Sequence, residues 1–310
     1  MIDLARKRIF IAGGSGFIGS HLRAALLQKG VPPAQISAPG SNECDLRVWP
    51  QCLAAMKGAE IVFDCAAVPG DLVLRSKMPG KLFYENLILG IHLTAAAFQS
   101  GAQKIITIGS ATEYPAAAPA PLSEENLWDG LPTSGNIPYG LSKRIAALQG
   151  ELYRREAGFN AIHVLLTNTY GPGERYASGY MVPSLIQKIL MAQARGESSI
   201  EVWGTGQAIR DLIFVEDAMA GIIAAAEKYD EGTPLNIASG SGISIRELVA
   251  LLCSLAGYAG EVRWDETKPE GDLKRLLNPR RAEEIIGFRA ATPLADGLRQ
   301  TIAWHRHEGK

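Results

Sequence analysis

The sequence has few cysteines, no long hydrophobic run and no excess of charge of either sign. Its four cysteines, Cys44, Cys52, Cys65 and Cys253, show no paired spacing, which argues against a disulfide framework or a zinc site and favours reduced thiols. The longest apolar runs have the length of a β-strand, well short of a membrane span. A net charge of −1, with acids and bases interspersed, gives no footprint for nucleic acid or an anionic membrane. We therefore expect a cytoplasmic protein without a nucleic-acid or membrane partner.

Metal ligands are also sparse. His305 and His307 form a His-x-His pair, but they lie in a charged C-terminal stretch, where we expect solvated side chains and no metal site. The 310 residues, 47% of them hydrophobic, are enough for one dominant domain with a large core and a smaller lobe.

The most informative stretch lies near the N-terminus, where a short apolar strand runs into a glycine-rich turn. Residues 8–19 read Arg-Ile-Phe-Ile-Ala-Gly-Gly-Ser-Gly-Phe-Ile-Gly, and Phe17 to Lys29 has the pattern of an amphipathic helix. Gly13 allows a sharp turn, Gly16 lets a diphosphate approach the backbone, and Gly19 lets the helix pack tightly on the sheet. The N–H groups and dipole of the helix start favour bound phosphate. A bare structural turn is the alternative, but the position between strand and helix favours dinucleotide binding. The residues predicted to bind the cofactor here are Gly13, Ser15, Gly16, Phe17, Ile18 and Gly19.

The residue at the end of the second strand usually separates NAD from NADP, because a carboxylate there binds the ribose hydroxyls and repels a 2′-phosphate. After the strand expected from Gln35 to Ala38, no acid occurs before Glu43, and residues 38–42 contain no arginine to bind the phosphate. Both NAD(H) and NADP(H) remain candidates, with a slight preference for NADP(H). Asp45 either accepts a hydrogen bond from the adenine or caps the short helix expected from Val48 to Met56. Further predicted cofactor contacts are Ser41, Asp45, Leu46, Ala66 and Ala67.

Two further strand-like segments, Glu60 to Ala67 and Lys104 to Ile108, are almost continuously apolar, and Leu82 to Ser100 between them reads as a long helix. Such strands, separated by helices, are typical of a parallel sheet covered on both faces. The small residues that end the first of them leave room for a cofactor across the sheet edge. We predict an α/β fold, a Rossmann-type doubly wound parallel sheet with a smaller C-terminal α/β lobe.

A hydroxyl, a phenol and an amine follow this sheet pattern. The strand to Ile108 leads into Ser110-Ala111-Thr112, and Tyr139 opens a helix expected to reach about Glu156, with Lys143 one turn away on the same face. Free tyrosine has a pKa of about 10, and a neighbouring ammonium lowers it toward the range of ready proton transfer. Ser110 can orient a substrate oxygen, and Lys143 can also hold the nicotinamide ribose. The predicted catalytic residues are Ser110, Thr112, Tyr139 and Lys143.

This order of motifs resembles the extended short-chain dehydrogenase/reductases of the NAD-dependent epimerase/dehydratase family, which modify nucleotide sugars. The resemblance covers essentially the whole chain and includes the later segments Asn168–Pro172, Val202–Asp211, Val215–Ala218 and Leu235–Gly240. It implies a Rossmann domain over residues 1–170 and about 217–240, and a nucleotide-sugar lobe over about 171–216 and 241–310.

The resemblance also implies a set of substrate contacts in the lobe. Asn168 matches a substrate-contacting asparagine, and Arg210 matches an arginine that binds the diphosphate, a role that suits its planar fork. A salt bridge to Asp211 is the alternative for Arg210, and a place in the core is the alternative for Trp203. Met181 to Arg195 reads as an amphipathic helix that roofs the cleft. The predicted substrate-binding residues are Asn168, Tyr180, Val182, Trp203, Arg210 and Arg275.

Within the family, Lys268 to Asn278 resembles a signature of GDP-L-fucose synthases and related GDP-4-keto-6-deoxyhexose reductases. Its basic pair, Lys274 and Arg275, either touches the nucleotide sugar or is solvated. Fucose synthases epimerise carbons 3 and 5 with a cysteine and a histidine before they reduce carbon 4. The matching positions hold Thr112 and Tyr180, a poorer base and a poorer acid near neutral pH, so we do not expect the epimerisation.

Dehydration is not expected either. Ala111 and Thr112 stand where dehydratases of the family carry an acid pair, and Glu113 should face away from the substrate by strand alternation. The favoured function is therefore NAD(P)-dependent 4-keto reduction of a GDP-linked 6-deoxyhexose. A nucleotide-sugar 4-epimerase with tightly bound NAD is the first alternative, and a non-catalytic cofactor-sensing protein is the second. The resemblance further implies a homodimer formed through the helices at Leu82–Ser100 and Tyr139–Glu156.

Overall fold

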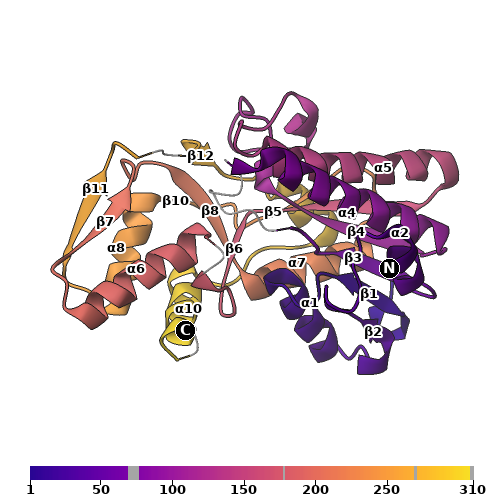
Figure 1. The fold of residues 1–310 in the computed structure, drawn as a ribbon, viewed down its shortest axis with the longest axis horizontal. Helices are drawn as coiled ribbons and strands as arrows, with labels where there is room; N and C mark the ends of the chain where they lie inside the picture. The colour runs from indigo at the N-terminus through magenta and orange to yellow at the C-terminus, as the bar shows by residue number, and fades with distance from the viewer. Residues whose placement is uncertain (69–76, 177–178, 269–270, 308–310) are drawn as a thin grey trace.

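The computed structural model describes residues 1–68, 77–176, 179–268 and 271–307, and it shows a large α/β domain joined to a smaller lobe (Figure 1). The large domain is built on a six-stranded sheet of order β2-β1-β3-β4-β5-β9 with parallel neighbours. These strands are β1 (Ile9–Ala12), β2 (Ile36–Ser37), β3 (Ile61–Asp64), β4 (Lys104–Ser110), β5 (Asn160–Leu166) and β9 (Leu235–Ile237). Because β2 lies on one side of β1 and β3 on the other, the chain winds both ways from β1. The predicted doubly wound parallel sheet is confirmed.

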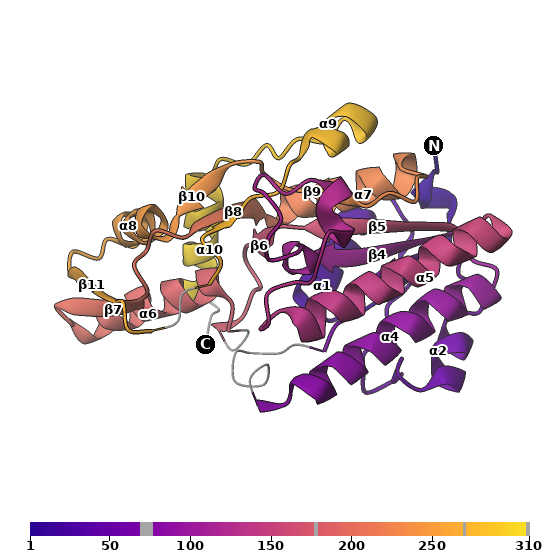
Figure 2. The ribbon, with the colours of Figure 1, turned by 90° about the horizontal axis from the view of Figure 1, so that it is seen from above.

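Helices cover both faces of this sheet, as Figure 2 shows from above. One face carries α1 (Phe17–Gln28), α7 (Val215–Lys228) and α9 (Arg280–Ile286); the other carries α2 (Trp49–Ala55), α4 (Pro79–Gln99) and α5 (Ser142–Ala157). Along β1, Ile9 and Ile11 pack toward α1 and α7, whereas Phe10 packs toward α2 and α4. Successive side chains of a strand point to opposite faces, so a sheet covered on both sides buries every residue. This is why the strands read as continuous apolar runs.

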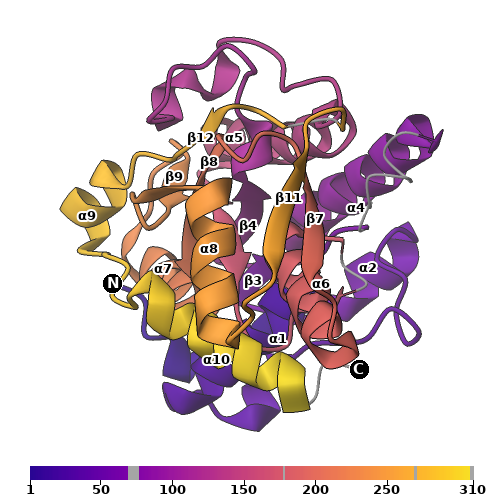
Figure 3. The ribbon, with the colours of Figure 1, turned by 90° about the vertical axis from the view of Figure 1, so that its left-hand side faces the viewer.

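The smaller lobe is organised around β8 (Ile209–Phe214). Its other elements are β6 (Asn168–Tyr170), β7 (Ser199–Trp203), β10 (Gly242–Ser244), β11 (Glu261–Asp265), β12 (Lys274–Arg275), α6 (Met181–Arg195), α8 (Ile245–Ala256) and α10 (Leu294–His307). Strands β6, β10 and β12 pair with β8, and β7 pairs with β11. Figure 3 looks onto this lobe and shows its three helices beside the β7–β11 pair. They enclose an apolar core of their own, which includes Tyr170 and Phe214. The predicted C-terminal α/β lobe is therefore present.

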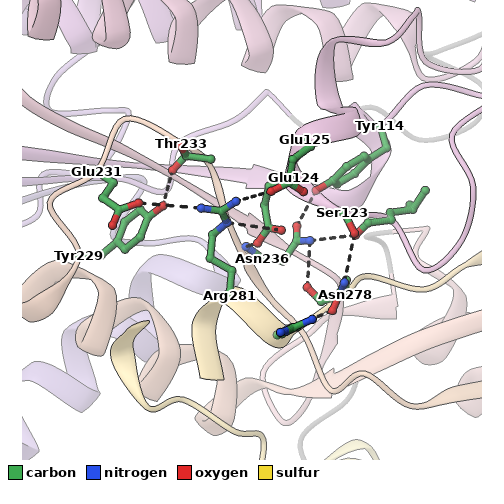
Figure 4. Close-up of polar contacts among 12 residues, drawn as sticks. Tyr114, Ser123, Glu124, Glu125, Tyr229, Glu231, Thr233, Asn236, Asn278 and Arg281 are labelled. Carbon is green, nitrogen blue, oxygen red and sulfur yellow. Dashed lines mark hydrogen bonds and ion pairs between the residues drawn. The ribbon is translucent and has the colours of Figure 1, made fainter. Parts of the chain in front are cut away.

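The C-terminal segment returns to the large domain before it ends in the lobe. Ala282 and Ile286 of α9 are buried in the core of the large sheet. Arg281, which precedes Ala282 in α9, lies 3.7 Å from Glu124 and 3.9 Å from Glu231, and it also bonds to Glu125 (Figure 4). The predicted division assigned residues 241–310 to the lobe, whereas the side chains of α9 pack against the sheet of the large domain.

Most predicted elements occur with small shifts at their ends. Helix α6 has the predicted bounds, and Ser244 forms a capping box with Glu247, whose backbone N–H donates to the serine Oγ at 3.2 Å. Two expectations need correction. Tyr139 lies in a π-helical turn, Ile137–Leu141, that precedes α5 and is continuous with it. Residues 116–138, between β4 and Tyr139, are polar in sequence and would be expected to form a loop, but they include a 3-10 helix, Glu124–Trp128, in which Leu127 is buried.

The described residues contain no helix that is long and apolar enough to cross a membrane. In the same part of the chain, no group of three or more His, Cys, Asp or Glu side chains is placed to hold a metal ion. All four cysteines are free thiols. The prediction that His305 is solvated is wrong. Its side chain is buried, on the face of α10 that also buries Leu298 and Ile302. Its ring stacks on Tyr176, with the ring centroids 4.3 Å apart.

Candidate active site

The glycine turn between β1 and α1 has the backbone geometry that the sequence predicts. Gly13 has a φ of +73°, and a Cβ there would lie 2.9 Å from the Cα of Ala66. A Cβ on Gly19 would lie 2.2 Å from the carbonyl oxygen of Gly13, closer than atoms can approach. Only glycine therefore fits at these two positions, one because of the turn and the other because α1 packs directly on it.

The start of α1 is open to a ligand. Its N-cap is Gly16, which has no side chain to cap the first N–H groups, and both Ser15 and Gly16 are exposed. A helix start without a capping side chain presents its N–H groups and the positive end of its dipole to an anion. This cradle of glycines at the carboxyl end of β1 fits a dinucleotide diphosphate. Phe17 and Ile18 form the first turn of that helix, as predicted.

At the adenosine end of the predicted cofactor site, the structure excludes one of the two interpretations of Asp45, the N-cap of α2. Helix α2 is capped by Val48, so Asp45 is not its N-cap. The Asp45 carboxylate binds Arg47 through both oxygens, each at 3.0 Å, and Arg47 also lies 3.6 Å from Glu85. An arginine thus follows shortly after residues 38–42, which contain none. Ser41 is exposed nearby in the chain, and Leu46 is buried against α2 and α4.

The hydroxyl groups of the predicted catalytic set meet at the end of β4. Ser110 ends the strand, and its Oγ accepts hydrogen bonds from the backbone N–H of Thr112 at 3.3 Å and from the Thr112 hydroxyl at 3.1 Å. Glu113 completes a capping box by accepting the Ser110 N–H at 2.8 Å. The chain is a 3-10 turn here, so strand alternation is the wrong reason for the orientation of Glu113. Its carboxylate nevertheless points inward, to His163.

The Glu113–His163 pair forms a buried support beneath this turn. The two side chains meet at 2.8 Å between Oε2 and Nε2. A Cβ on Gly109 would lie 2.3 Å from a Glu113 oxygen and 2.5 Å from a His163 ring carbon. Gly109 therefore provides the space that the pair occupies, and the pair in turn holds the N–H of Ser110. Sequence reasoning missed this support, since His163 lies fifty residues away on β5.

Tyr139 reaches the same place from the π-helical turn. A Cβ on Gly140 would lie 2.6 Å from the carbonyl oxygen of Thr112, so this glycine lets the turn pack directly on the Ser110–Thr112 backbone. Ser142 stabilises the turn by donating its hydroxyl to the Tyr139 carbonyl at 2.7 Å. The phenol and the two hydroxyls therefore come from backbone segments in direct contact.

Lys143 joins the tyrosine to the cofactor side of the site. Its ammonium donates to the carbonyl oxygen of Ala66 at 2.8 Å, and it lies 3.6 Å from the carboxylate of Asp64. Ala66 is also the residue that faces Gly13 of the glycine turn. The lysine thus bonds to backbone that borders the predicted dinucleotide cradle. Ala67 follows and is exposed.

Burial and charge act in opposite directions on the two titrating groups. Burial raises the pKa of Tyr139 to about 12, and the Lys143 ammonium opposes that rise. Burial lowers the pKa of Lys143, but the negative charges of Asp64, Tyr139 and Glu113 outweigh it, so that this pKa is raised. Lys143 therefore lowers the pKa of Tyr139, as predicted, but in the protein without ligands the opposite effect of burial is larger. At neutral pH the phenol carries its proton and the amine is charged.

The predicted substrate residues of the lobe divide into exposed and buried groups. Tyr180, half exposed, precedes α6, and its effect on the pKa of Tyr139 places it near that phenol. Asn168 is exposed and donates to the Asp211 carbonyl at 3.0 Å. Val182 is buried in the core of the lobe. Trp203 is 52% exposed, which contradicts the alternative that placed it in the core.

The two arginines of the lobe hold the segment before and at β12. Arg210 donates to the carbonyl oxygen of Asp272 at 2.7 Å. The expected alternative partner, Asp211, instead accepts a hydrogen bond from the Ser239 hydroxyl at 2.6 Å. Arg275 is buried, pairs with Asp272 and donates to the carbonyl oxygen of Ala111. It therefore connects the lobe to the catalytic turn and is not solvated; Lys274 is exposed. Residues 269 and 270 of the Lys268–Asn278 signature lie outside the described residues.

The structure thus brings together Ser110, Thr112, Tyr139, Lys143 and Ala66 near the glycine turn. It adds Asp64, Glu113 and His163, which the sequence interpretation did not place in the site. One signal for Asp64 was available: it is an acid at the end of the otherwise apolar β3.

Comparison with known proteins agrees with this geometry. A model of the NAD dependent epimerase/dehydratase family matches residues 9–238. A GDP-L-fucose synthase of Sinorhizobium fredii is 30% identical over 302 residues, which cover 96% of this chain and 95% of that protein. A GDP-L-fucose synthase of Escherichia coli is 29% identical over 313 residues, which cover 97% of each.

Solved structures share the whole fold. A GDP-6-OMe-4-keto-L-xylo-heptose reductase of Campylobacter jejuni superposes with a TM-score of 0.90 at 23% identity, covering 97% of this chain and 98% of that one. A GDP-mannoheptose C4 reductase of the same organism, solved with NADP bound, has a TM-score of 0.89 at 24% identity, covering 99% and 100%. The fold, the ordered motifs and the family match all agree. The chain belongs to the NAD dependent epimerase/dehydratase family.

Proposed function

We propose that this protein is an NAD(P)-dependent oxidoreductase that reduces the 4-keto group of a GDP-linked 6-deoxyhexose without inverting carbons 3 and 5. The observation that carries the proposal is the packing of the Tyr139–Lys143 turn on the Ser110–Thr112 backbone, with Lys143 bonded to Ala66 beside the glycine turn. The full-length similarity to GDP-L-fucose synthases supports the substrate class. Thr112 and Tyr180 argue against the epimerisation, because a threonine hydroxyl is a far poorer base than the cysteine thiolate, and a tyrosine a poorer acid than the histidine, that fucose synthases use at these positions.

The residues divide the work of carbonyl reduction among them. When bound, the reduced nicotinamide supplies the hydride. Tyr139 donates the proton to the sugar oxygen, and its raised pKa keeps that proton in place at neutral pH. Ser110 donates a hydrogen bond that orients the same oxygen, while Glu113 fixes the Ser110 backbone. The Lys143 ammonium stabilises the negative charge left on Tyr139 after proton transfer.

The lobe would hold the nucleotide sugar. Arg210 would bind the diphosphate, and the half-exposed ring of Trp203, with Lys268 5.9 Å from its centroid, is placed to contact the base or ribose. Tyr180 would contact the sugar near Tyr139. Arg275 would act through the Ala111 carbonyl, by keeping the catalytic turn in register with the lobe.

The test is a panel of GDP-, UDP- and dTDP-linked 4-keto sugars, with NADPH absorbance as the readout. The proposal expects consumption of NADPH with a GDP-linked 4-keto-6-deoxyhexose, and loss of turnover by about 10²- to 10⁴-fold in Tyr139→Phe. Tyr84→Phe, at an exposed tyrosine of α4, is the matched control and should keep full activity. Sugar isomerisation without net change in cofactor would identify a 4-epimerase instead. NADPH binding without turnover of any sugar would favour a cofactor-sensing protein.

We further propose that two copies of the chain associate through α4 and α5. On α5, Leu148 and Leu152 are 37% and 50% exposed, although they lie on the apolar side of the helix. Packing against the same pair from a second copy would bury these leucines in a four-helix arrangement. Sedimentation velocity of the intact protein should give twice the 33.2 kDa chain mass, and Leu152→Lys should shift it toward a single chain.

We also propose that the protein acts in the cytoplasm, because its four cysteines are free thiols, as a reducing compartment would keep them.

A further inference from the structure

The carboxylate of Asp64 is a buried charge with no part in the reaction proposed above. It follows three apolar residues of β3 and is 0% exposed. Its Oδ1 accepts the backbone N–H of Ala66 at 3.1 Å, whereas Oδ2 has no hydrogen-bond partner among the described residues. A buried carboxylate with an unsatisfied oxygen is costly unless an opposing charge offsets it. An apolar residue of the same size would suit the end of this strand better.

The opposing charge is the catalytic lysine. The Lys143 ammonium lies 3.6 Å from Asp64 Oδ2 and donates to the Ala66 carbonyl at 2.8 Å. Asp64, Ala66 and Lys143 therefore form a closed ring of contacts, in which the carboxylate holds the N–H of the residue whose carbonyl holds the ammonium. The ring joins the ends of β3 and of the tyrosine–lysine turn at the border of the glycine cradle.

We propose that Asp64 is a positioning residue for Lys143: it fixes the ammonium against the Ala66 carbonyl and keeps it charged beside Tyr139. This role rests on the proposed function only in that Lys143 serves a reaction on a sugar. The contacts that define it all lie within the protein and do not depend on which sugar is bound. A buried amine without this counter-ion would lose its proton more easily, and a neutral amine would neither stabilise the tyrosinate nor hold the ribose of the cofactor as firmly.

The charged and titratable groups around the lysine support this assignment. From the neighbouring elements, Asp64, Tyr139, Glu113 and Cys65 face Lys143, and Asp64 contributes the largest of the stabilising charges. His163 faces Asp64 from β5 and lowers the pKa of that carboxyl, although burial, which is larger, raises it. Of the effects that lower the pKa of Asp64, the charge of the Lys143 ammonium is the largest, although burial outweighs them together. The attraction between the two groups therefore favours the charged form of each, and for Lys143 the charges that favour the ammonium exceed the effect of burial.

A double-mutant cycle tests the pairing without any ligand. Asp64→Asn, Lys143→Met and the combined variant are unfolded in urea at pH 7.5. Removing one partner leaves the other charge buried and unpaired, so the double variant should be more stable than the sum of the single effects predicts, by a factor of about 10 or more in the unfolding constant. Glu124→Gln, a buried carboxylate of the Arg281 cluster, combined with Lys143→Met is the matched control and should be additive. Additivity in the Asp64 cycle would overturn the proposal.

The pH dependence of NADPH binding tests the charge on Lys143. Cofactor fluorescence gives the dissociation constant from pH 6 to about 11, because the pKa of Lys143 is raised above its ordinary value of 10.5. In Asp64→Asn, which keeps the shape of the side chain, the loss of affinity at alkaline pH should begin about one pH unit or more below that of the unmodified protein. Asp64→Glu should return it toward the original value, and Glu124→Gln should leave it unchanged. An unshifted profile in Asp64→Asn would contradict the proposal. If the profile shifts but no 4-keto sugar is reduced, the role of Asp64 stands and the proposed substrate fails.

Discussion

Glu174 makes the stability of the protein depend on pH in a defined direction. It follows β6 in the loop that begins at Gly171, is 5% exposed, and burial raises its pKa to about 8 from an ordinary 4.5. The folded protein therefore binds a proton here that the unfolded chain has released. Stability from this group is fully present below pH 4.5 and is lost as the pH rises through 8. At 1.36 kcal/mol for each pH unit, the difference between 4.5 and about 8 is about 5 kcal/mol.

Glu174→Gln isolates this contribution, since glutamine mimics the protonated acid at every pH. Urea unfolding followed by circular dichroism should give similar free energies for the two proteins at pH 5. At pH 9 the variant should be the more stable by up to about 5 kcal/mol. Glu266→Gln, at an exposed acid, is the control and should show no such trend. A difference between Glu174→Gln and the unmodified protein that stays constant from pH 5 to 9 would refute the reasoning.

Three further predictions test the turns and the lobe. Gly19→Ala places a Cβ 2.2 Å from the Gly13 oxygen, so NADPH affinity measured by fluorescence should fall by about tenfold or more. Gly140→Ala places a Cβ 2.6 Å from the Thr112 oxygen and should displace Tyr139 from the Ser110–Thr112 backbone, so kcat should fall by about 10- to 100-fold; an unchanged kcat would contradict the direct packing of this turn on Thr112. His305 is buried and burial lowers its pKa to about 4, so its contribution to stability is present above pH 6.5 and is lost as the pH falls toward 4. In His305→Phe, the free energy of unfolding should therefore decrease by about 3 kcal/mol less between pH 6.5 and pH 4 than in the unmodified protein, as measured by urea unfolding.

The candidate site could be predicted where its chemistry depends on local spacing. Three short motifs define it: the glycine turn, the Ser110–Thr112 segment and the Tyr139–Lys143 pair. Each spans only a few residues, and the structure brings the backbone of all three together. The buried supports could not be found in this way. Glu113 meets His163 across fifty residues, and Arg275 reaches the Ala111 carbonyl across 164, so neither contact leaves a periodic pattern in the chain.

The layered α/β fold follows from local sequence patterns, because continuous apolar strands and amphipathic helices can be buried together only in a sheet covered on both faces. Local sequence also determined where glycine must stand in the first turn. Tertiary structure decided the placement of side chains whose burial depends on distant partners. Arg281 packs with the large domain, His305 stacks inside the lobe, and Asp64 lies against Lys143. In each case a polar group is buried because a distant part of the chain supplies its neighbour, and local sequence carries no record of that neighbour.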